Sequence, residues 1–181
     1  MAKVVLTDAS VFHGPLDLSG SANQVSMNGS REVVSVTNFA SGGWEESIPG
    51  MRSASGNVSG FLSDAADPDA SLHSNVTGFP FTVTKTNPAA VEDVAYAMNV
   101  HRTSYSPTFN VGEAYGFSAD VVADSSMVRG QILTNATVSS TGSTTGFEAG
   151  AVSAAQSAYA GLHVTSAGAT SLAVTIQSDD N

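Results

Sequence analysis

The chain has 181 residues, enough for one domain or for one domain and a fragment, and its 41% hydrophobic content argues against intrinsic disorder. Its 6 basic and 16 acidic residues give a net charge of −10, which argues against binding to nucleic acid through a basic surface. The absence of cysteine excludes disulfides and cysteine-based zinc sites. No signal peptide and no run of 18 apolar residues is visible, so we expect synthesis and folding in the cytoplasm without membrane insertion.

Short strands are predicted through the first third of the chain. Residues 3–7 and 24–28 are short candidates, and residues 31–39 are rich in β-branched side chains. Residues 53–62 alternate with a period of two, which is typical of a half-buried strand. One face carries Ala54, Gly56, Val58, Gly60 and Leu62, and the other carries Ser53, Ser55, Asn57 and Ser59, with Phe61 as the exception.

One short α-helix is predicted at about 67–77. Asp67 can cap its first turn, and Pro68 suits the first helical position. Leu72 and Val76 lie four residues apart on one face, and Gly78 can end the helix.

Further strands are predicted after the helix, at 79–84, 113–122 and 172–177, where apolar and polar residues alternate. Residues 88–100 fit either a helix or a strand. We favour the strand, because Tyr96 then joins the core of the sheet.

The composition changes near residue 129, after which lysine and arginine are absent and Ser, Thr, Ala and Gly dominate. This change predicts a β domain at 1–128, followed at 129–181 by a β-rich extension or a partial second β domain.

The sequence offers no clear catalytic or metal-binding constellation. None of the four histidines, at 13, 73, 101 and 163, has a second ligand at the spacing of a metal site, and we expect the His163 ring to be hydrogen-bonded on a strand. The acid pairs at 45–46 and 92–93 could form a glycosidase pair, but solvated loop charges are the better interpretation. We therefore predict no enzyme activity, no cofactor and no metal.

The order of several short motifs resembles the major tail protein, or tail tube protein, family of long-tailed siphovirus-type bacteriophages. These motifs are MAKVVLTDASVFHGPLDLSGSANQVSMN at the start, VVSVTNFASGGWEESIPGMRSASGNVSGFLSD, and SYSPTFNVGEAYGFSADV. The resemblance covers most of the chain. It implies a mainly β fold, an antiparallel sandwich or barrel-like tail-tube fold with one short helix and a small β-rich C-terminal part.

The segment LHVTSAGATSLAVTIQSDDN resembles the first half of a C-terminal β-sandwich that continues further in relatives. The chain is therefore either a natural short form or part of a longer sequence. The neutral residues from Ser53 to Ser59 also depart from relatives, which often carry a charge there.

The resemblance implies stacked rings, commonly of six subunits, that form a conduit for DNA inside the virion tail, assembled in the host cytoplasm. The loop between two long strands would reach the adjacent ring. Its residues here are Trp44, Glu45, Glu46, Ile48, Pro49, Gly50 and Met51. Trp44 would be a buried contact in that interface, or alternatively would fold back over its own hairpin.

The polar residues Ser53, Ser55, Asn57 and Ser59 are candidates for the wall of the conduit, because small neutral side chains would not bind passing DNA. Implied partners are further copies of the chain and the tape measure, tail terminator and distal tail proteins. Two rival functions remain open. A head decoration protein would share the acidic β-rich composition, and a carbohydrate-binding β-sandwich would need more exposed aromatics than Phe147 and Tyr159 after residue 129.

Overall fold

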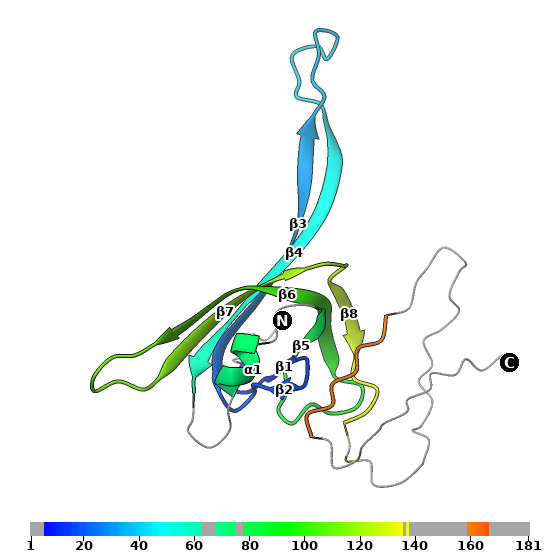
Figure 1. Ribbon diagram of the computed structural model, residues 1–181. Coiled ribbons are helices and arrows are strands. Elements are labelled where there is room, and N and C mark those ends of the chain that lie inside the picture. Colours follow the sequence, from blue (N-terminus) through cyan, green and yellow to red (C-terminus); the bar gives the residue numbers. More distant parts are fainter. Residues whose placement is uncertain (1–5, 63–67, 75–77, 136, 138–158, 167–181) are drawn as a thin grey trace, which may run out of the picture.

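The computed structural model describes residues 6–62, 68–74, 78–135, 137 and 159–166. It contains one antiparallel sheet that curls without closing, and one short helix (Figure 1). The elements are β1 Ser10–His13, β2 Leu16–Asp17, β3 Ala22–Ser35, β4 Ser47–Phe61, α1 Pro68–Ser74, β5 Phe79–Thr84, β6 Val94–Thr108, β7 Gly116–Ala123 and β8 Val128–Gln131. The prediction of a mainly β, antiparallel fold with one short helix is confirmed.

The strand order is β2-β1-β5-β6-β7-β4-β3, with β8 also paired to β6. β6 joins the two halves of the sheet. Its first part pairs with β5 as far as Val100, and its second part pairs with β7 from Val100 to Thr108. The pairing of β6 with β7 has a register shift between Arg102 and Ser104, just after the pairing of β6 with β5 ends at Val100. The sheet can therefore bend at β6 so that the two halves enclose a core.

The core lies on one face of the sheet, where α1 covers it. Leu72 of α1 is fully buried, as are Val58 of β4 and Phe81 of β5. Two polar contacts fix the helix to β6: the Tyr105 hydroxyl donates to Asp69, and the Arg102 guanidinium donates to the backbone carbonyl of His73 at 3.0 Å. Burial, and secondarily the Asp69 contact, raises the pKa of Tyr105. No helix among the described residues is long and apolar enough to cross a membrane.

The predicted alternation in residues 53–62 is confirmed. Ala54 and Val58 are buried, whereas Ser53 and Phe61 are exposed. The predicted strands at 79–84 and 113–122 correspond to β5 and β7, and Phe117, Ala119 and Val121 are buried. The predicted helix corresponds to α1, although residues 67 and 75–77 lie outside the described residues.

The boundaries of the two long strands were predicted wrongly. β3 is one strand from 22 to 35, where the sequence predicted two, because Gly29 and Ser30 pair with Ala54 and Ser53 and so continue the ladder. β4 begins at residue 47 and not at 53. Pro49 is tolerated there because this part of β4 has only one neighbouring strand.

Other local predictions were only partly right. The strand interpretation holds from residue 94, but Tyr96 is 44% exposed and does not join the buried core. Of the predicted strand at 3–7, residues 6 and 7 are not in a strand, residues 3–5 lie outside the described residues, and β1 is the first strand among the described ones. The predicted strand at 172–177 lies outside the described residues.

The chain from residue 128 onwards contributes a strand to the sheet and packs against the face of β1 and β5 that is opposite the core. β8, at 128–131, pairs with the start of β6. His163 reaches the β1–β5 region, where Nδ1 donates to the carbonyl of Gly14 at 2.8 Å and Nε2 accepts from the Thr82 hydroxyl at 2.7 Å. The hydrogen-bonded ring is confirmed, whereas the predicted strand is wrong, because residues 159–166 have no strand.

His13 is the largest ionisable side chain in the core. It is 1% exposed, and the rings of Phe79 and Phe81 lie 6.1 and 6.2 Å from its ring. Its Nδ1 atom has no hydrogen-bond partner among the described residues. Burial and, secondarily, the positive charge of Arg102 lower the pKa of His13 to about 4.

This depressed pKa predicts acid destabilisation. The unfolded chain takes up the His13 proton near the ordinary pKa of about 6.5, whereas the folded chain resists it to about pH 4. The free energy of unfolding should therefore fall as the pH drops through this window, by up to about 3 kcal/mol from His13. Urea unfolding at several pH values should show a smaller fall for His13→Leu. An equal fall in both proteins would contradict the assignment.

Candidate assembly surfaces

The β3–β4 hairpin projects from the body of the sheet (Figure 1). β4 pairs with β7 only over residues 55–61, so residues 47–54 pair with β3 alone. We call residues 30–53, with the loop at 36–46, the hairpin arm. No other described strand pairs with the arm, and all of its residues except Ser41 and Gly50 are exposed.

Backbone turns fix the tip of the hairpin arm. Val36 N–H donates to the carbonyl of Glu46 at 2.8 Å, and Glu46 N–H donates to the Thr37 hydroxyl at 2.9 Å. Gly42 and Gly43 have φ values of +63° and +86°, a region that favours glycine. The two glycines before Trp44 therefore make the turn, and the indole ring is not needed to hold it.

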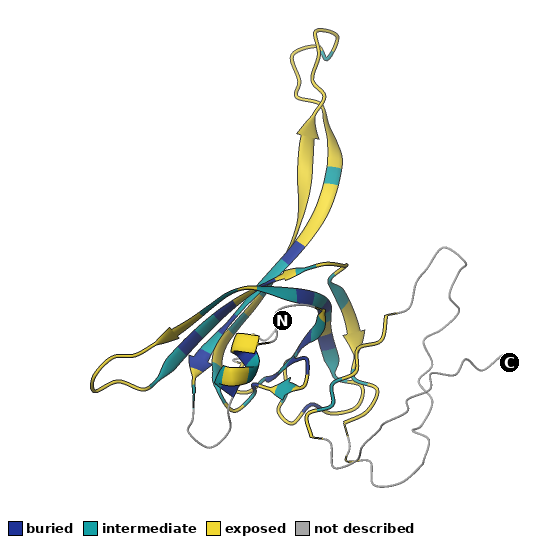
Figure 2. Cartoon of the chain, in the orientation of Figure 1, coloured by how far each residue is buried: buried dark blue, intermediate teal, exposed yellow. Residues whose placement is uncertain are grey.

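Most of the arm is exposed (Figure 2), and several of its exposed residues are apolar. Trp44 is 82% exposed, Met51 80% and Ile48 52%, so in the single chain Trp44 does not cover its hairpin. Further exposed apolar residues, which the sequence analysis did not single out, are Val33, Val34, Val36 and Phe39. The sequence feature that could have identified them is the run of β-branched residues at 31–39. This run predicted a strand, but it did not predict that both faces of the strand are exposed to solvent.

The predicted inter-ring residues are divided between loop and strand. Trp44, Glu45 and Glu46 lie in the exposed loop, as predicted. The other four, Ile48, Pro49, Gly50 and Met51, lie in β4. The prediction that they belong to the loop is wrong, because Pro49 and Ile48 pair with Val33 and Val34 and extend the ladder beyond the turn-forming residues.

The predicted polar face of β4 belongs to a wider polar surface formed by β3, β4, β7 and β6. Asn57 donates to Asp120 Oδ1 at 2.7 Å and to Ser118 Oγ at 3.2 Å on β7, and Ser104 of β6 donates to Asp120 Oδ2 at 2.5 Å. Ser53 bonds Ser30 of β3 at 2.8 Å. The Ser104 and Asn57 hydrogen bonds lower the pKa of Asp120. We call this surface the polar face; Ser55, Asn57 and Ser59 are its half-buried members on β4.

One surface of β3 and β4 thus changes character along its length. It is polar from Gln24 to Ser30 and from Ser59 to Ser53, and it becomes apolar at Met51, Ile48 and Val34 on the arm. A methyl group built on Gly50 would meet Glu32 and Val34, which places these side chains together on the arm. Water can cover the polar part at no cost, whereas the apolar part gains free energy if protein covers it.

Two strand edges that are unpaired among the described residues bound the four-stranded unit β6-β7-β4-β3. β3 pairs only with β4, and β6 loses its β5 neighbour after Val100 while β7 continues on its other side. Residues 101–108 of β6 therefore form a free edge opposite that of β3. Free edges are templates for pairing with another chain.

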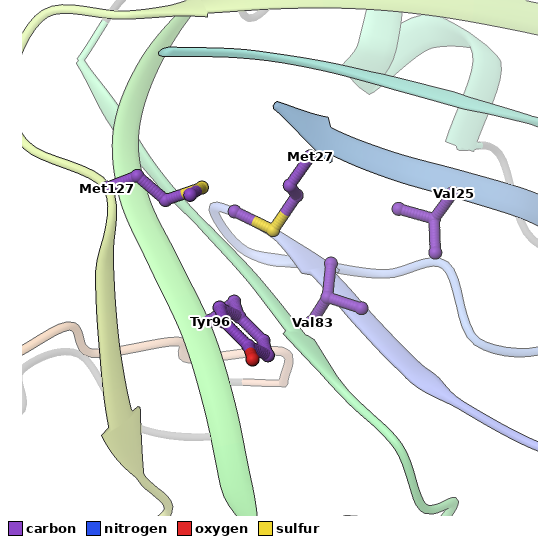
Figure 3. Close-up of a pocket in the computed structure, with 5 residues that line it drawn as sticks. All are labelled: Val25, Met27, Val83, Tyr96 and Met127. Atoms are coloured by element: carbon purple, nitrogen blue, oxygen red, sulfur yellow. The ribbon is translucent and has the colours of Figure 1, made fainter. Parts of the chain in front are cut away.

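A hollow of about 390 Å³ lies inside the curl of the sheet (Figure 3). Val25, Met27, Val83, Tyr96 and Met127 line it. The Tyr96 phenol is the one ionisable group among these five, so the hollow lacks an acid–base pair. The described residues also contain no group of three or more His, Cys, Asp or Glu side chains that could hold a metal ion.

The exposure of the arm predicts that its apolar side chains contribute little to folding. Replacing both Trp44 and Ile48 by alanine should change the free energy of unfolding of the single chain by less than about 0.5 kcal/mol. Phe81→Ala, a control in the core, should cost about 3–5 kcal/mol. Urea unfolding measures both. A loss of several kcal/mol in the arm variant would show that Trp44 packs against its own chain.

No protein-family model and no curated protein matches this chain. Solved structures do. A chain in the virion of a native gene transfer agent particle aligns with a TM-score of 0.54 at 18% identity, covering 71% of this chain and 99% of that chain. The SPP1 tail tube aligns with a TM-score of 0.56 at 11% identity, covering 73% of this chain and 81% of that chain. The six-fold symmetrised baseplate of the anti-feeding prophage aligns with a TM-score of 0.53 at 9% identity, covering 71% of this chain and 97% of that chain. At these identities the likeness concerns the fold, and the described part of this chain has the fold of phage tail tube proteins.

Proposed function

We propose that this protein is a structural subunit of a phage tail tube, which polymerises as stacked rings through which DNA is delivered. The observation that carries the proposal is the combination of an open polar face with a projecting apolar arm on the same two strands. A conduit needs a wetted wall inside and covered apolar contacts between its subunits. The fold shared with the SPP1 tail tube supports the same function.

The two free edges provide the contact within a ring. Each neighbouring pair in the order β6-β7-β4-β3 is antiparallel, so β3 and β6 run in opposite directions. The β6 edge of a second copy can therefore join β3 as the next antiparallel strand. Repeated around a ring, this pairing closes the four-stranded units into a barrel with no free edge. The tail of the empty gene transfer agent particle has C6 symmetry, and we propose six subunits here.

The polar face then forms the wall of the conduit. Its members in β3, β4, β6 and β7 are Gln24, Ser26, Asn28, Ser30, Ser53, Ser55, Asn57, Ser59, His101, Ser104, Ser106, Ser118 and Asp120, with Val122 as an apolar member. Asp120 is the one carboxylate in this set, which contains no lysine or arginine. Phosphates would find no cationic contact on such a wall, so DNA would pass without binding.

The hairpin arm provides the contact between rings. Trp44, Ile48 and Met51 would be buried against the adjacent ring, with Glu45 and Glu46 at the rim. The protein would then reside in the virion tail. It would contact the tape measure, tail terminator and distal tail proteins, and it would assemble in the host cytoplasm.

Hydrogen exchange tests the ring contact. In assembled protein, the backbone amides of β3 and of residues 101–108 should exchange more slowly than in the monomer, because both edges become paired. The amides of β5, which is paired on both sides in the single chain, serve as the control and should be unchanged. Negative-stain microscopy should show tubes. Monomers only, or small capsomer-sized oligomers with unprotected edges, would contradict the proposal and favour a head decoration protein.

The wall is tested by adding cations to it. Replacing Ser55 and Asn57 by lysine should permit folding and tube assembly but slow DNA delivery, because the lysines would contact phosphates along the conduit. Lysines at Ala70 and Ser74 on α1, on the opposite side of the sheet, are the matched control and should leave delivery unchanged. Phage infectivity and DNA ejection rates measure the effect. Normal ejection with lysine at both wall positions would exclude this face as the wall.

A further inference from the structure

The turn between β6 and β7, residues 109–115, is a second exposed apolar surface. Phe109 is 73% exposed and Val111 fully exposed, and the Phe109 ring stacks on Tyr115 at 4.6 Å. Asn110 Nδ2 donates to Glu113 Oε2 at 2.7 Å, and the Glu113 backbone N–H donates to the carbonyl of Asn110 at 3.2 Å. These contacts hold the turn in one shape around a hollow of about 310 Å³.

The turn lies at the opposite end of the four-stranded unit from the hairpin arm. β4 pairs with β7 so that Phe61 meets Gly116, next to the turn, while Ser55 meets Val122 at the end from which the arm projects. Figure 1 shows the arm and the β6–β7 turn pointing in different directions from the sheet. In a stack of rings with one polarity, the turn of one ring faces the arm of the next.

The base of the arm carries an unbalanced charge. Arg31 and Arg52 are directly opposite one another across β3 and β4, and both are exposed. Arg31 donates to the carbonyl of Gly50 at 3.3 Å, and no carboxylate of the described residues accepts from it. Like charges at opposed positions destabilise a ladder, so a carboxylate brought there by another chain would be stabilising.

We propose that the β6–β7 turn of one subunit docks on the base of the hairpin arm of a second copy in the adjacent ring. Glu113 of the turn would lie against Arg31 and Arg52, and Val111 against Val33, which is two residues from Arg31 on the same face of β3 and is 70% exposed. The inference rests on the tube function proposed above and adds the surface that receives the arm.

Dimensions and symmetry agree with this contact. Residues 47–54 of β4 extend beyond the β7 pairing by roughly 26 Å at about 3.3 Å per residue. The near surface of a stacked ring would therefore lie at the base of the arm, and the tip would reach further along that ring. The turn and the arm are different surfaces at opposite ends of the subunit. Such a head-to-tail contact repeats without closing and produces an open-ended polymer, as a tube requires.

Charge reversal tests the contact. Glu113→Arg should raise the protein concentration needed for tube assembly by more than about tenfold, because the repulsion recurs at every subunit of a ring. The defect should ease at high salt, which screens exposed charges. Asp8→Arg changes the net charge equally at an exposed site outside the contact and is the matched control. Adding Arg31→Glu and Arg52→Glu to Glu113→Arg should restore assembly.

The outcomes separate this inference from the tube function. Tubes from the natural sequence together with unaffected Glu113→Arg tubes would overturn the docking contact alone, as would a defect that the paired reversal fails to rescue. Absence of tubes from the natural sequence would overturn both. Since the chain has no cysteine, Val111→Cys with Val33→Cys supplies a second measurement. Oxidation should link subunits into ladders, whereas the control pair Val91→Cys with Val33→Cys should not; equal linking by both pairs would contradict the contact.

Discussion

The ladder between β3 and β4 is the constraint on which the rest of the molecule depends. β4 has neighbours on both sides only between residues 55 and 61, and its remaining half pairs with β3 alone. The paired half supplies Val58 and Ala54 to the core, and the single-sided half becomes the arm. One pair of strands thus contributes both to the stability of the subunit and to the surface available to other subunits.

Two glycines allow the sheet to pack this closely. A methyl group built on Gly60 would lie 2.0 Å from the carbonyl oxygen of Ser21, and one on Gly56 would lie 2.9 Å from the carbonyl oxygen of Ser26. The close approach of β3 to β4 leaves no room for a side chain at these positions. The glycines of residues 53–62 therefore serve the packing of the ladder, while the serines between them remain on the polar face.

Folding and assembly draw on separate residues. The core consists of residues such as Phe81, Val58 and Leu72, whereas the arm and the β6–β7 turn carry many of the exposed apolar residues. A monomer that keeps apolar side chains in water is prone to association. In the proposed tube, these side chains at two different ends of the subunit would direct the association along one axis, and the free edges of β3 and β6 would direct it around that axis.

The sequence by itself determined the β character of the chain, the helix at α1, the glycine turn before Trp44 and the two-faced pattern of residues 53–62. These features are local: strand periodicity, a proline at the first helical position and glycines with positive φ are decided within a few residues. Only the tertiary structure decided that β3 is continuous through Gly29, that β4 begins before Pro49, and that Tyr96 lies outside the core. Each of these depends on which strand lies alongside. Pairing partners distant in the sequence override local propensity, and a single sequence does not specify where a neighbouring strand ends.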